Sequence, residues 1–123
     1  MPHLKKDERL RKEERLRRKR DFQSIARDGT RRNTKNFLII MRRNDLGFSR
    51  VGAVASRKMG KAVERNRVKR LIREFFRRNK DKLPPSTDYL IVGKKGAQSL
   101  NYVQVVEELR PLLVQGEDER DSG

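Results

Sequence analysis

The strongest pattern of apolar and polar positions in the chain lies between residues 62 and 80. At 3.6 residues per turn the large apolar side chains fall on one stripe of a helix, with Ala62 at its edge. The stripe consists of Val68, Leu71, Ile72, Phe75 and Phe76. A stripe of this width must face a core, so the pattern predicts an amphipathic helix packed on another element.

Three other stretches have the composition of β-strands. Residues 36–42 are apolar on both faces, and residues 88–94 have Tyr89 to Val92 at their centre. Residues 50–56 carry mostly small side chains on both faces of the expected strand, which allows another element to approach closely. A short further strand is predicted near Arg31 to Thr34. Strands that are apolar on both faces need a covering layer on each side.

Two other helices are predicted around these strands. The first covers residues 22–26 and ends at Gly29, for which we expect the left-handed conformation. The last begins at Asn101, which with Gln104 has a capping-box arrangement, and Pro111 should kink it or end it early. Its apolar stripe consists of Tyr102, Val105, Val106, Leu109 and Leu113.

The order of these elements predicts an α+β fold: a small α/β sandwich with a central mixed sheet and helices packed on it. The strands at 50–56 and 88–94 and the helix between them form a candidate βαβ crossover. Pro84-Pro85 is a stiff connector before the second of these strands. Such crossovers are right-handed in about 98% of cases, so the pattern alone favours that hand.

Composition narrows the classes of partner and chemistry. Charged residues make up 41% of the chain, and a net charge of +16 with a pI near 11.1 implies a polyanionic partner. The absence of cysteine excludes disulfides, thiolate metal sites and cysteine nucleophiles. There is no apolar run of about 18 residues and no apolar segment near Met1, so we expect a cytoplasmic protein with no membrane partner.

The face of the 62–80 helix opposite the apolar stripe is strongly cationic. It carries Asn66, Lys69, Arg70, Arg73 and Arg77, with Arg67 and Arg78 beside them. Residues 61–80 contain nine Lys or Arg against two Glu, so ion pairs within the helix cannot neutralise this face. Guanidinium groups suit phosphate oxygens because they can donate two hydrogen bonds at once. The pattern therefore predicts a helix that binds RNA.

Charge also divides the chain into three parts. Residues 1–20 are a basic N-terminal arm, with ten Lys or Arg against four acids between 3 and 20, and we expect it to be disordered until it meets RNA. Residues 21–115 form the folded RNA-binding domain, since 123 residues are enough for one modest core. Residues 116–123 are an acidic tail, expected to be disordered, to which we assign no function.

The run from Arg65-Asn66-Arg67 to Arg73, preceded by Ser56 to Gly60 and by Ala62-Val63, resembles the Arg-Asn-Arg signature of the bacterial ribonuclease P protein subunit. The resemblance covers residues 3 to about 113. It extends to Phe22-Gln23, Gly29-Thr30, Phe37, Arg50 to Gly52 and Asp88-Tyr89. It implies the α/β sandwich of that family, with a left-handed βαβ crossover that departs from the general rule.

The same resemblance implies the protein subunit of a ribonucleoprotein endoribonuclease that removes the 5′ leader from precursor tRNA. The partners would be the catalytic ribonuclease P RNA and precursor tRNA, with Mg²⁺ held mainly by the RNA and no small-molecule cofactor. Metal ligands in the protein stay unassigned, and no catalytic residue is expected in the chain. The expected RNA contacts are Arg57, Lys58, Lys61, Arg65, Asn66, Arg67, Lys69, Arg70, Arg73 and Arg77.

The resemblance further implies a cleft, between the first helix and the exposed sheet face, that holds the single-stranded leader. Phe22 and Phe37 fit this leader cleft, and core packing is the alternative for both. Where relatives often carry further aromatic residues, this chain has Ala26 and Ile40. Because a base stacked on an aromatic ring contributes about 1 to 3 kcal/mol, stacking on the leader should be weaker here.

The residues offer no independent means of cutting RNA, so the chain alone should be inactive. His3, the one histidine, lies in the basic arm, and Asp28, Asp45, Asp81 and Asp88 lie at loops or element ends rather than in a cluster that could hold metals. A ribosomal or other structural RNA-binding protein without a role in tRNA processing would share the charge and the arm. A helix-turn-helix DNA-binding protein is disfavoured because a strand leads into the cationic helix.

Overall fold

The computed structural model describes residues 10–122, with side chains described as far as Leu113. Its helices are α1 (Lys19–Asp28), α2 (Ala62–Asn79) and α3 (Tyr102–Ser122). Its strands are β1 (Thr30–Asn33), β2 (Phe37–Arg43), β3 (Arg50–Ala55) and β4 (Thr87–Gly93). Short 3-10 turns lie at Lys12–Glu14, Arg57–Met59, Lys80–Lys82 and Ala97–Ser99. The predicted α+β class and order of elements are confirmed.

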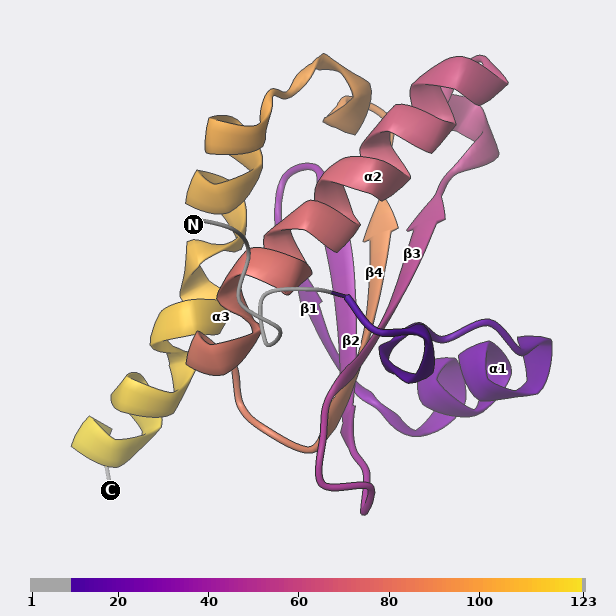
Figure 1. Ribbon diagram of the computed structural model, residues 1–123. Coiled ribbons are helices and arrows are strands. Elements are labelled where there is room, and N and C mark those ends of the chain that lie inside the picture. Colours follow the sequence, from indigo (N-terminus) through magenta and orange to yellow (C-terminus); the bar gives the residue numbers. More distant parts are fainter. Residues whose placement is uncertain (1–9, 123) are drawn as a thin grey trace, which may run out of the picture.

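The four strands form one mixed sheet in the order β1-β2-β4-β3 (Figure 1). β2 pairs antiparallel with both β1 and β4, whereas β3 pairs in parallel with β4. Ile91 of β4 lies between Ile39 of β2 and Ala53 of β3. The short strand predicted near Arg31 is present as β1, at the opposite edge of the sheet from β3.

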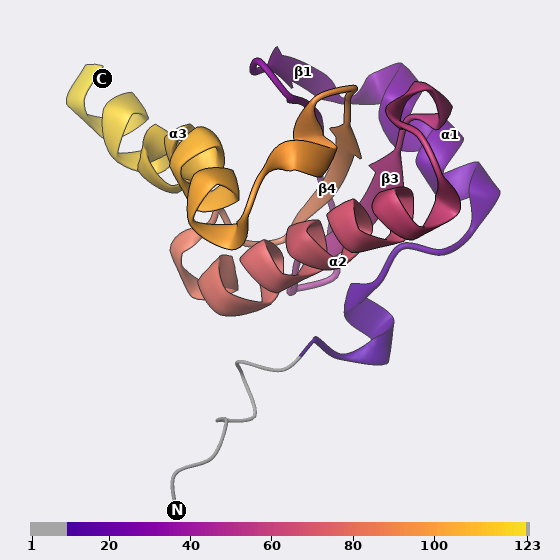
Figure 2. The same cartoon turned by 90° about the horizontal axis from the view of Figure 1, so that it is seen from above.

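The connection from β3 through α2 to β4 is left-handed. In Figure 1 both strands run upward, α2 lies in front of the sheet and β4 lies to the left of β3. Figure 2, seen from above, places α2 on the same side of the sheet. Seen from the helix side, a right-handed crossover would put the second strand to the right of the first. The hand implied by the family resemblance is therefore present, and the hand favoured by the general rule is not.

The larger core lies between α2, α3 and one face of the sheet. Side chains alternate along each strand, so Phe37 and Ile39 point into this core while Leu38 and Ile40 point to the other face. The Tyr89 hydroxyl, buried in the same core, donates a hydrogen bond to the Pro84 carbonyl at 2.6 Å. Among the described side chains of α2 and α3, the fully buried ones are Val68, Ile72, Phe75, Phe76, Val105, Leu109 and Leu112.

A smaller cluster lies on the opposite face of the sheet, under α1. Leu16, Ile25, Ile40 and Leu90 are its buried members. Gly29, which follows α1, has a φ of −81° rather than the expected left-handed value. A Cβ there would come within 2.6 Å of Ile40 and 2.7 Å of the Ile25 carbonyl, so close approach, not a left-handed turn, calls for glycine here. This cluster fixes α1 over only part of the sheet face.

Residues 10–20 are folded onto the domain, so the predicted disorder of the 1–20 arm is wrong for this part. Leu16 is 6% exposed and its backbone N–H donates to the Val51 carbonyl at 2.8 Å. The Glu14 carboxylate pairs with Lys80 at 2.9 Å. A buried apolar side chain and a buried ion pair hold the segment, which charge composition alone does not reveal. Residues 1–9, with His3, lie outside the described residues.

Of the two predicted effects of Pro111, a kink or an early end, the early end is wrong, because the last helix continues through Pro111 to Ser122. Pro111 removes one backbone hydrogen bond, but Leu112, which follows it, is 1% exposed in the larger core and keeps this part of the helix packed. The same helix therefore runs from the predicted domain at residues 21–115 into the predicted tail as far as Ser122.

Candidate nucleic-acid interface

The outer face of α2 carries the predicted cationic residues. Its buried positions, Val68, Ile72, Phe75 and Phe76, face the sheet and α3, which fixes the rotation of the helix about its axis. Asn66 and Arg70 are consequently exposed, and Lys69, Arg73 and Arg77 are half-buried. The structure thus brings the whole predicted arc onto one surface.

Some of the predicted RNA contacts have partners within the protein. Arg67 is half-buried and donates to the carbonyls of Gln98 and Leu100 at 3.1 and 2.8 Å, which ties α2 to the turn before α3. Arg77 pairs with Glu74 at 2.9 Å. For Arg67 a structural function is therefore present that sequence reasoning missed, because its partners lie more than 30 residues away.

The remaining cations of this surface form no ion pair with any residue that the structure describes. They are Arg57, Lys58, Lys61, Lys69, Arg70 and Arg73. Arg65 donates one hydrogen bond, to the Gly60 carbonyl at 2.8 Å, and keeps its other donors. Burial and the nearby charge of Arg15 hold the pKa of Arg73 below its ordinary value. An anion bound here would relieve repulsion that the fold itself creates.

The turn before α2 fixes where its three cations lie. Met59 is 3% exposed and packs in the larger core, which anchors the turn. Gly60 has a φ of +139°, a conformation that other residues rarely adopt, and a Cβ there would collide with the Glu64 carboxylate. Glu64 in turn accepts a hydrogen bond from the Lys61 backbone N–H at 3.1 Å. The cations of this turn are Arg57, Lys58 and Lys61, all exposed beside the start of α2.

The other face of the sheet has an apolar surface that α1 covers only in part. Phe22 of α1 is half-buried and lies over Gly52 of β3, where a Cβ would come within 2.8 Å of its ring. Leu38, Val54 and Val92 are also only half-buried on this face. Phe22 is therefore placed between α1 and the sheet, with part of its surface open.

Phe37 does not belong to this face, so its assignment to a leader cleft is wrong. Its side chain is fully buried in the larger core, on the face covered by α2 and α3. Ile40, three residues further along β2, points to the α1 face and is 2% exposed there. The core-packing alternative holds for Phe37 because the side-chain alternation of β2 points it away from α1.

A buried carboxylate, that of Asp88, binds two arginines on the α1 side of the sheet, at the end where β3 and β4 begin. Asp88 is fully buried and accepts two hydrogen bonds from Arg50, both at 2.8 Å, and one from Asn44 at 2.9 Å. Burial alone would raise the pKa of Asp88, but these hydrogen bonds and the arginine charges hold it below its ordinary value. Arg42 lies 3.5 Å from the same carboxylate and also donates to Ser24. Sequence reasoning missed this cluster because its members come from separate segments.

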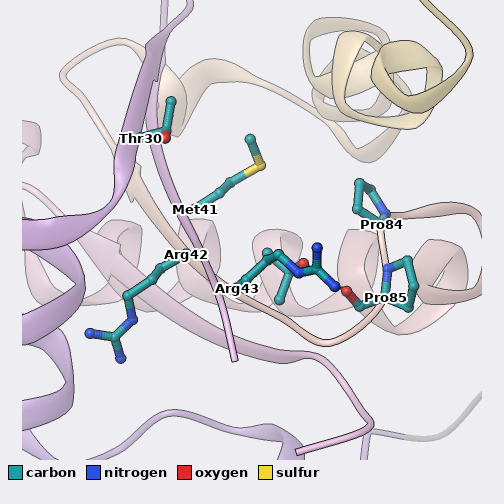
Figure 3. A pocket seen from close by; sticks show the side chains of 7 residues that line it. Thr30, Met41, Arg42, Arg43, Pro84 and Pro85 are labelled. Carbon is teal, nitrogen blue, oxygen red and sulfur yellow. Dashed lines mark hydrogen bonds between the residues drawn. The ribbon is translucent and has the colours of Figure 1, made fainter. Parts of the chain in front are cut away.

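A hollow at the same end of the sheet holds none of the predicted contacts (Figure 3). It is lined by Thr30, Met41, Arg42, Arg43, Pro84, Pro85 and Thr87. In Figure 3 the Arg43 side chain extends toward Pro85, whereas Arg42 turns to the α1 side. Strand register places this hollow at the opposite end of the sheet from the turn at Arg57–Met59, since Arg43 pairs with Thr87 and Ala55 with Gly93.

Two negative findings apply to the part of the chain that the structure describes. No group of three or more His, Cys, Asp or Glu residues is arranged to hold a metal ion there. None of its helices is long and apolar enough to cross a membrane.

Comparisons with known proteins identify a family whose solved members share this fold. The family model described as Ribonuclease P matches residues 10–116. The "Ribonuclease P protein component" of Syntrophus aciditrophicus is 46% identical over 110 residues, covering 89% of this chain and 87% of the relative.

Two solved structures are similar as well. The RNase P protein from Thermotoga maritima superposes with a TM-score of 0.75 at 38% identity, covering 83% of this chain and 96% of the other. The Staphylococcus aureus RNase P protein superposes with a TM-score of 0.74 at 28% identity, covering 84% and 94%. With its mixed sheet, left-handed crossover and cationic α2, the chain belongs to the ribonuclease P protein family, the protein component of an endoribonuclease of precursor-tRNA 5′ maturation.

Proposed function

We propose that the outer face of α2 and the turn before it bind the catalytic RNA of the holoenzyme. The observation that carries this proposal is the set of cations on one surface, among them Lys69, Arg70 and Arg73, that form no ion pair within the described residues. Seven Lys or Arg side chains and one amide would make the contacts: Arg57, Lys58, Lys61, Arg65, Asn66, Lys69, Arg70 and Arg73. Arg67 and Arg77 would contribute less, because each is engaged with the protein.

The single-stranded leader of precursor tRNA would lie on the half-covered face between α1 and the sheet. The open part of the Phe22 ring and the half-buried Leu38 and Val92 support this, since apolar and aromatic surface favours unpaired bases. Arg42 and Arg50, held by Asp88, are 27% and 21% exposed at the end of this face and can reach phosphates. Of the two aromatic residues predicted for the leader cleft, Phe22 is thus the one that remains a candidate for stacking on this face.

In this proposal the chain binds and orients RNA in the cytoplasm, while Mg²⁺ is held by the RNA. Such ions would activate the attacking water and stabilise the leaving oxygen. The protein's own cations would bring the two RNAs together by neutralising phosphates that otherwise repel. Family membership sets aside the alternative of an RNA-binding protein with no part in tRNA processing.

The test is cleavage of a precursor tRNA at low Mg²⁺ by a bacterial ribonuclease P RNA. Reactions contain the RNA alone, the chain alone, or both. We expect cleavage at the mature 5′ end to require both. No stimulation by the chain would refute the proposed function, and cutting by the repurified chain alone would refute the assignment of chemistry to the RNA.

Two substitutions separate the proposed surfaces. Arg70→Ala should weaken assembly with the catalytic RNA by about tenfold, because it removes one charge-assisted contact. Phe22→Ala should chiefly raise the concentration of precursor tRNA needed for half-maximal cleavage. Circular dichroism in sulfate checks that both variants fold. Equal effects of the two substitutions on both measurements would contradict separate surfaces.

A further inference from the structure

The segment before α1 crosses the edge of the sheet and is held there at two alternate positions. Glu14, 7% exposed, accepts hydrogen bonds from Lys80 at 2.9 and 3.0 Å. Leu16 is buried on the α1 side of the sheet and bonds to the Val51 carbonyl through its backbone N–H. Arg15, between them, pairs with Val51 in a single parallel bridge. The segment is therefore an ordered extension of the β3 edge.

The residues between and after the held positions are exposed cations. Arg15, Arg17 and Arg18 line a hollow at this edge together with Lys12 and Arg50. Two acids, Glu13 and Asp21, line it as well, so the cations are in excess. Apart from Arg50, none of these cations forms an ion pair with any other described residue. The hollow thus has the charge and the free donors for several phosphates.

An aromatic side chain lies in the same hollow. Phe48, from the loop between β2 and β3, is half-buried and forms part of the wall, next to Leu46. A ring at this depth can stack on an unpaired base, which contributes about tenfold or more to affinity. A rigid RNA duplex would offer phosphates but no free base, so the combination of cations with one ring favours a single strand.

The hollow adjoins the cationic face of α2. Burial lowers the pKa of the Arg73 side chain on α2, and the charge of Arg15 lowers it further. Lys80, which holds Glu14, follows directly on α2. Cationic surface therefore runs from α2 around the outer edge of β3 toward the first turn of α1.

We propose that residues 12–18, with Phe48 and Arg50, form a preformed binding site for an unpaired RNA strand. Arg15, Arg17 and Arg18 take its phosphates and Phe48 stacks one base. The proposal rests on the proposed function for the source of the strand, which is either the leader of precursor tRNA or an unpaired part of the catalytic RNA. Because the backbone of the segment is already fixed by Glu14 and Leu16, little ordering entropy is lost on binding.

The first test measures binding of an unstructured RNA oligonucleotide by fluorescence anisotropy over a range of salt concentrations. The double variant Arg15→Ala/Arg17→Ala should bind at least about tenfold more weakly. The slope of log K against log salt should fall by about 1.4, for two lost phosphate contacts on a single strand. The control is Arg32→Ala/Lys35→Ala, which removes the same charge at the opposite edge of the sheet. Equal losses in the two variants would overturn the proposal.

The second test asks whether the held backbone matters, by two substitutions with the same change of charge. Glu14→Gln breaks the pair with Lys80, whereas Glu13→Gln removes an exposed acid that has no partner among the described residues. Both make the protein more positive, so bulk electrostatics predicts tighter binding for both. We expect Glu13→Gln to bind slightly tighter and Glu14→Gln about tenfold more weakly, since freeing the segment restores ordering entropy. Tighter binding by both would overturn the preformed site.

Holoenzyme assays of the same variants distinguish whether the bound strand is the leader of precursor tRNA or an unpaired part of the catalytic RNA. Arg15→Ala/Arg17→Ala should either weaken binding of precursors with long leaders more than those with short ones, or weaken assembly with the catalytic RNA at every leader length. If wild-type chain fails to stimulate cleavage, the proposed function fails while the oligonucleotide tests still decide the site. If it stimulates cleavage and the double variant matches the wild type in all assays, the site alone is refuted.

Discussion

Replacing Asp88 by asparagine tests whether the buried carboxylate holds the lower end of the sheet together. The substitution keeps the size of the side chain and removes its charge. The Arg50 guanidinium, 21% exposed, now donates to both carboxylate oxygens at 2.8 Å; in the variant it faces one uncharged acceptor oxygen and one NH₂ group. Arg42 loses the same counter-charge, and Asn44 faces an amide instead of a carboxylate.

Breaking one side of a buried ion pair costs about 3 to 5 kcal/mol, because the remaining charge stays desolvated and unpaired. Arg50 can turn partly into solvent, so we expect Asp88→Asn to fall at the low end, about 3 kcal/mol. For a domain whose total stability is about 5 to 15 kcal/mol, this is a large fraction. Asp45→Asn is the matched control, since Asp45 is exposed in the neighbouring loop and has no partner among the described residues.

The assay is urea unfolding in sulfate, at pH 7 and at a series of lower values. The pKa of Asp88 is below its ordinary value in the folded protein, so its contribution is complete above the unfolded value of about 3.9. That contribution disappears as the pH falls through the lower folded value. The wild type should therefore lose its advantage over Asp88→Asn in this acid range. A loss at pH 7 no larger than that of Asp45→Asn would refute the reasoning.

Two further substitutions test other parts of the structure. Phe37→Ala should cost about 3 to 5 kcal/mol of stability, because it leaves a cavity in the larger core. Once the variant is folded in sulfate, it should bind leader RNA as tightly as the wild type does. Weakened leader binding by a folded variant would show that Phe37 does contribute to the leader cleft. Glu108→Gln should cost about 1 to 3 kcal/mol in urea unfolding at pH 7, because the Glu108 carboxylate accepts from the backbone and side chain of Asn36 at 2.5 and 2.7 Å. Burial opposes ionisation of Glu108, but these bonds and one from Thr34 hold its pKa below the ordinary value. The difference in stability between wild type and variant should therefore vanish as the pH falls through the lowered pKa of the folded protein. A difference in stability that does not depend on pH would contradict this.

The α2 helix could be predicted from sequence because two independent patterns coincide on it. Its apolar stripe and its cationic arc lie on opposite sides of the same 3.6-residue period, so each fixes the other. The residues of the cationic arc could be identified without knowledge of tertiary contacts. Their partners within the protein could not, because Arg67 donates to the carbonyls of residues 98 and 100, which no local sequence pattern connects to it.

The two faces of β2 could not be told apart from sequence. Phe37 and Ile39 on one side and Leu38 and Ile40 on the other are all apolar, so alternation gives two faces without saying which one the larger core covers. Only the packing of α2 and α3 decides this. The assignment of Phe37 to a cleft therefore had no local observation that could have corrected it.

The prediction of disorder is wrong for residues 10–20 for a related reason. The composition of the basic arm is that of a disordered tail, and the contacts that order residues 10–20 are made with residues 51 and 80, far away in the chain. Two side chains with low exposure, Glu14 and Leu16, outweigh the average of the segment. Mean hydropathy and charge describe a segment as a whole, whereas one buried ion pair and one buried leucine are enough to hold it.

The positions of Arg15 and Arg73 link the stability of this protein to its ligand. Burial is the main cause of the lowered pKa of Arg73, and the nearby charge of Arg15 lowers it further, so folding in the absence of anions must overcome both the desolvation of Arg73 and its repulsion from Arg15. A polyanion bound to the same surface removes the repulsion and binds only the folded form. Stabilisation then grows as RT ln(1 + [L]/Kd), which is about 2.7 kcal/mol when the ligand concentration is about 100 times the dissociation constant. RNA binding and folding should therefore be coupled at this edge: Arg15→Ala should stabilise the free protein and at the same time reduce the stabilisation that RNA confers.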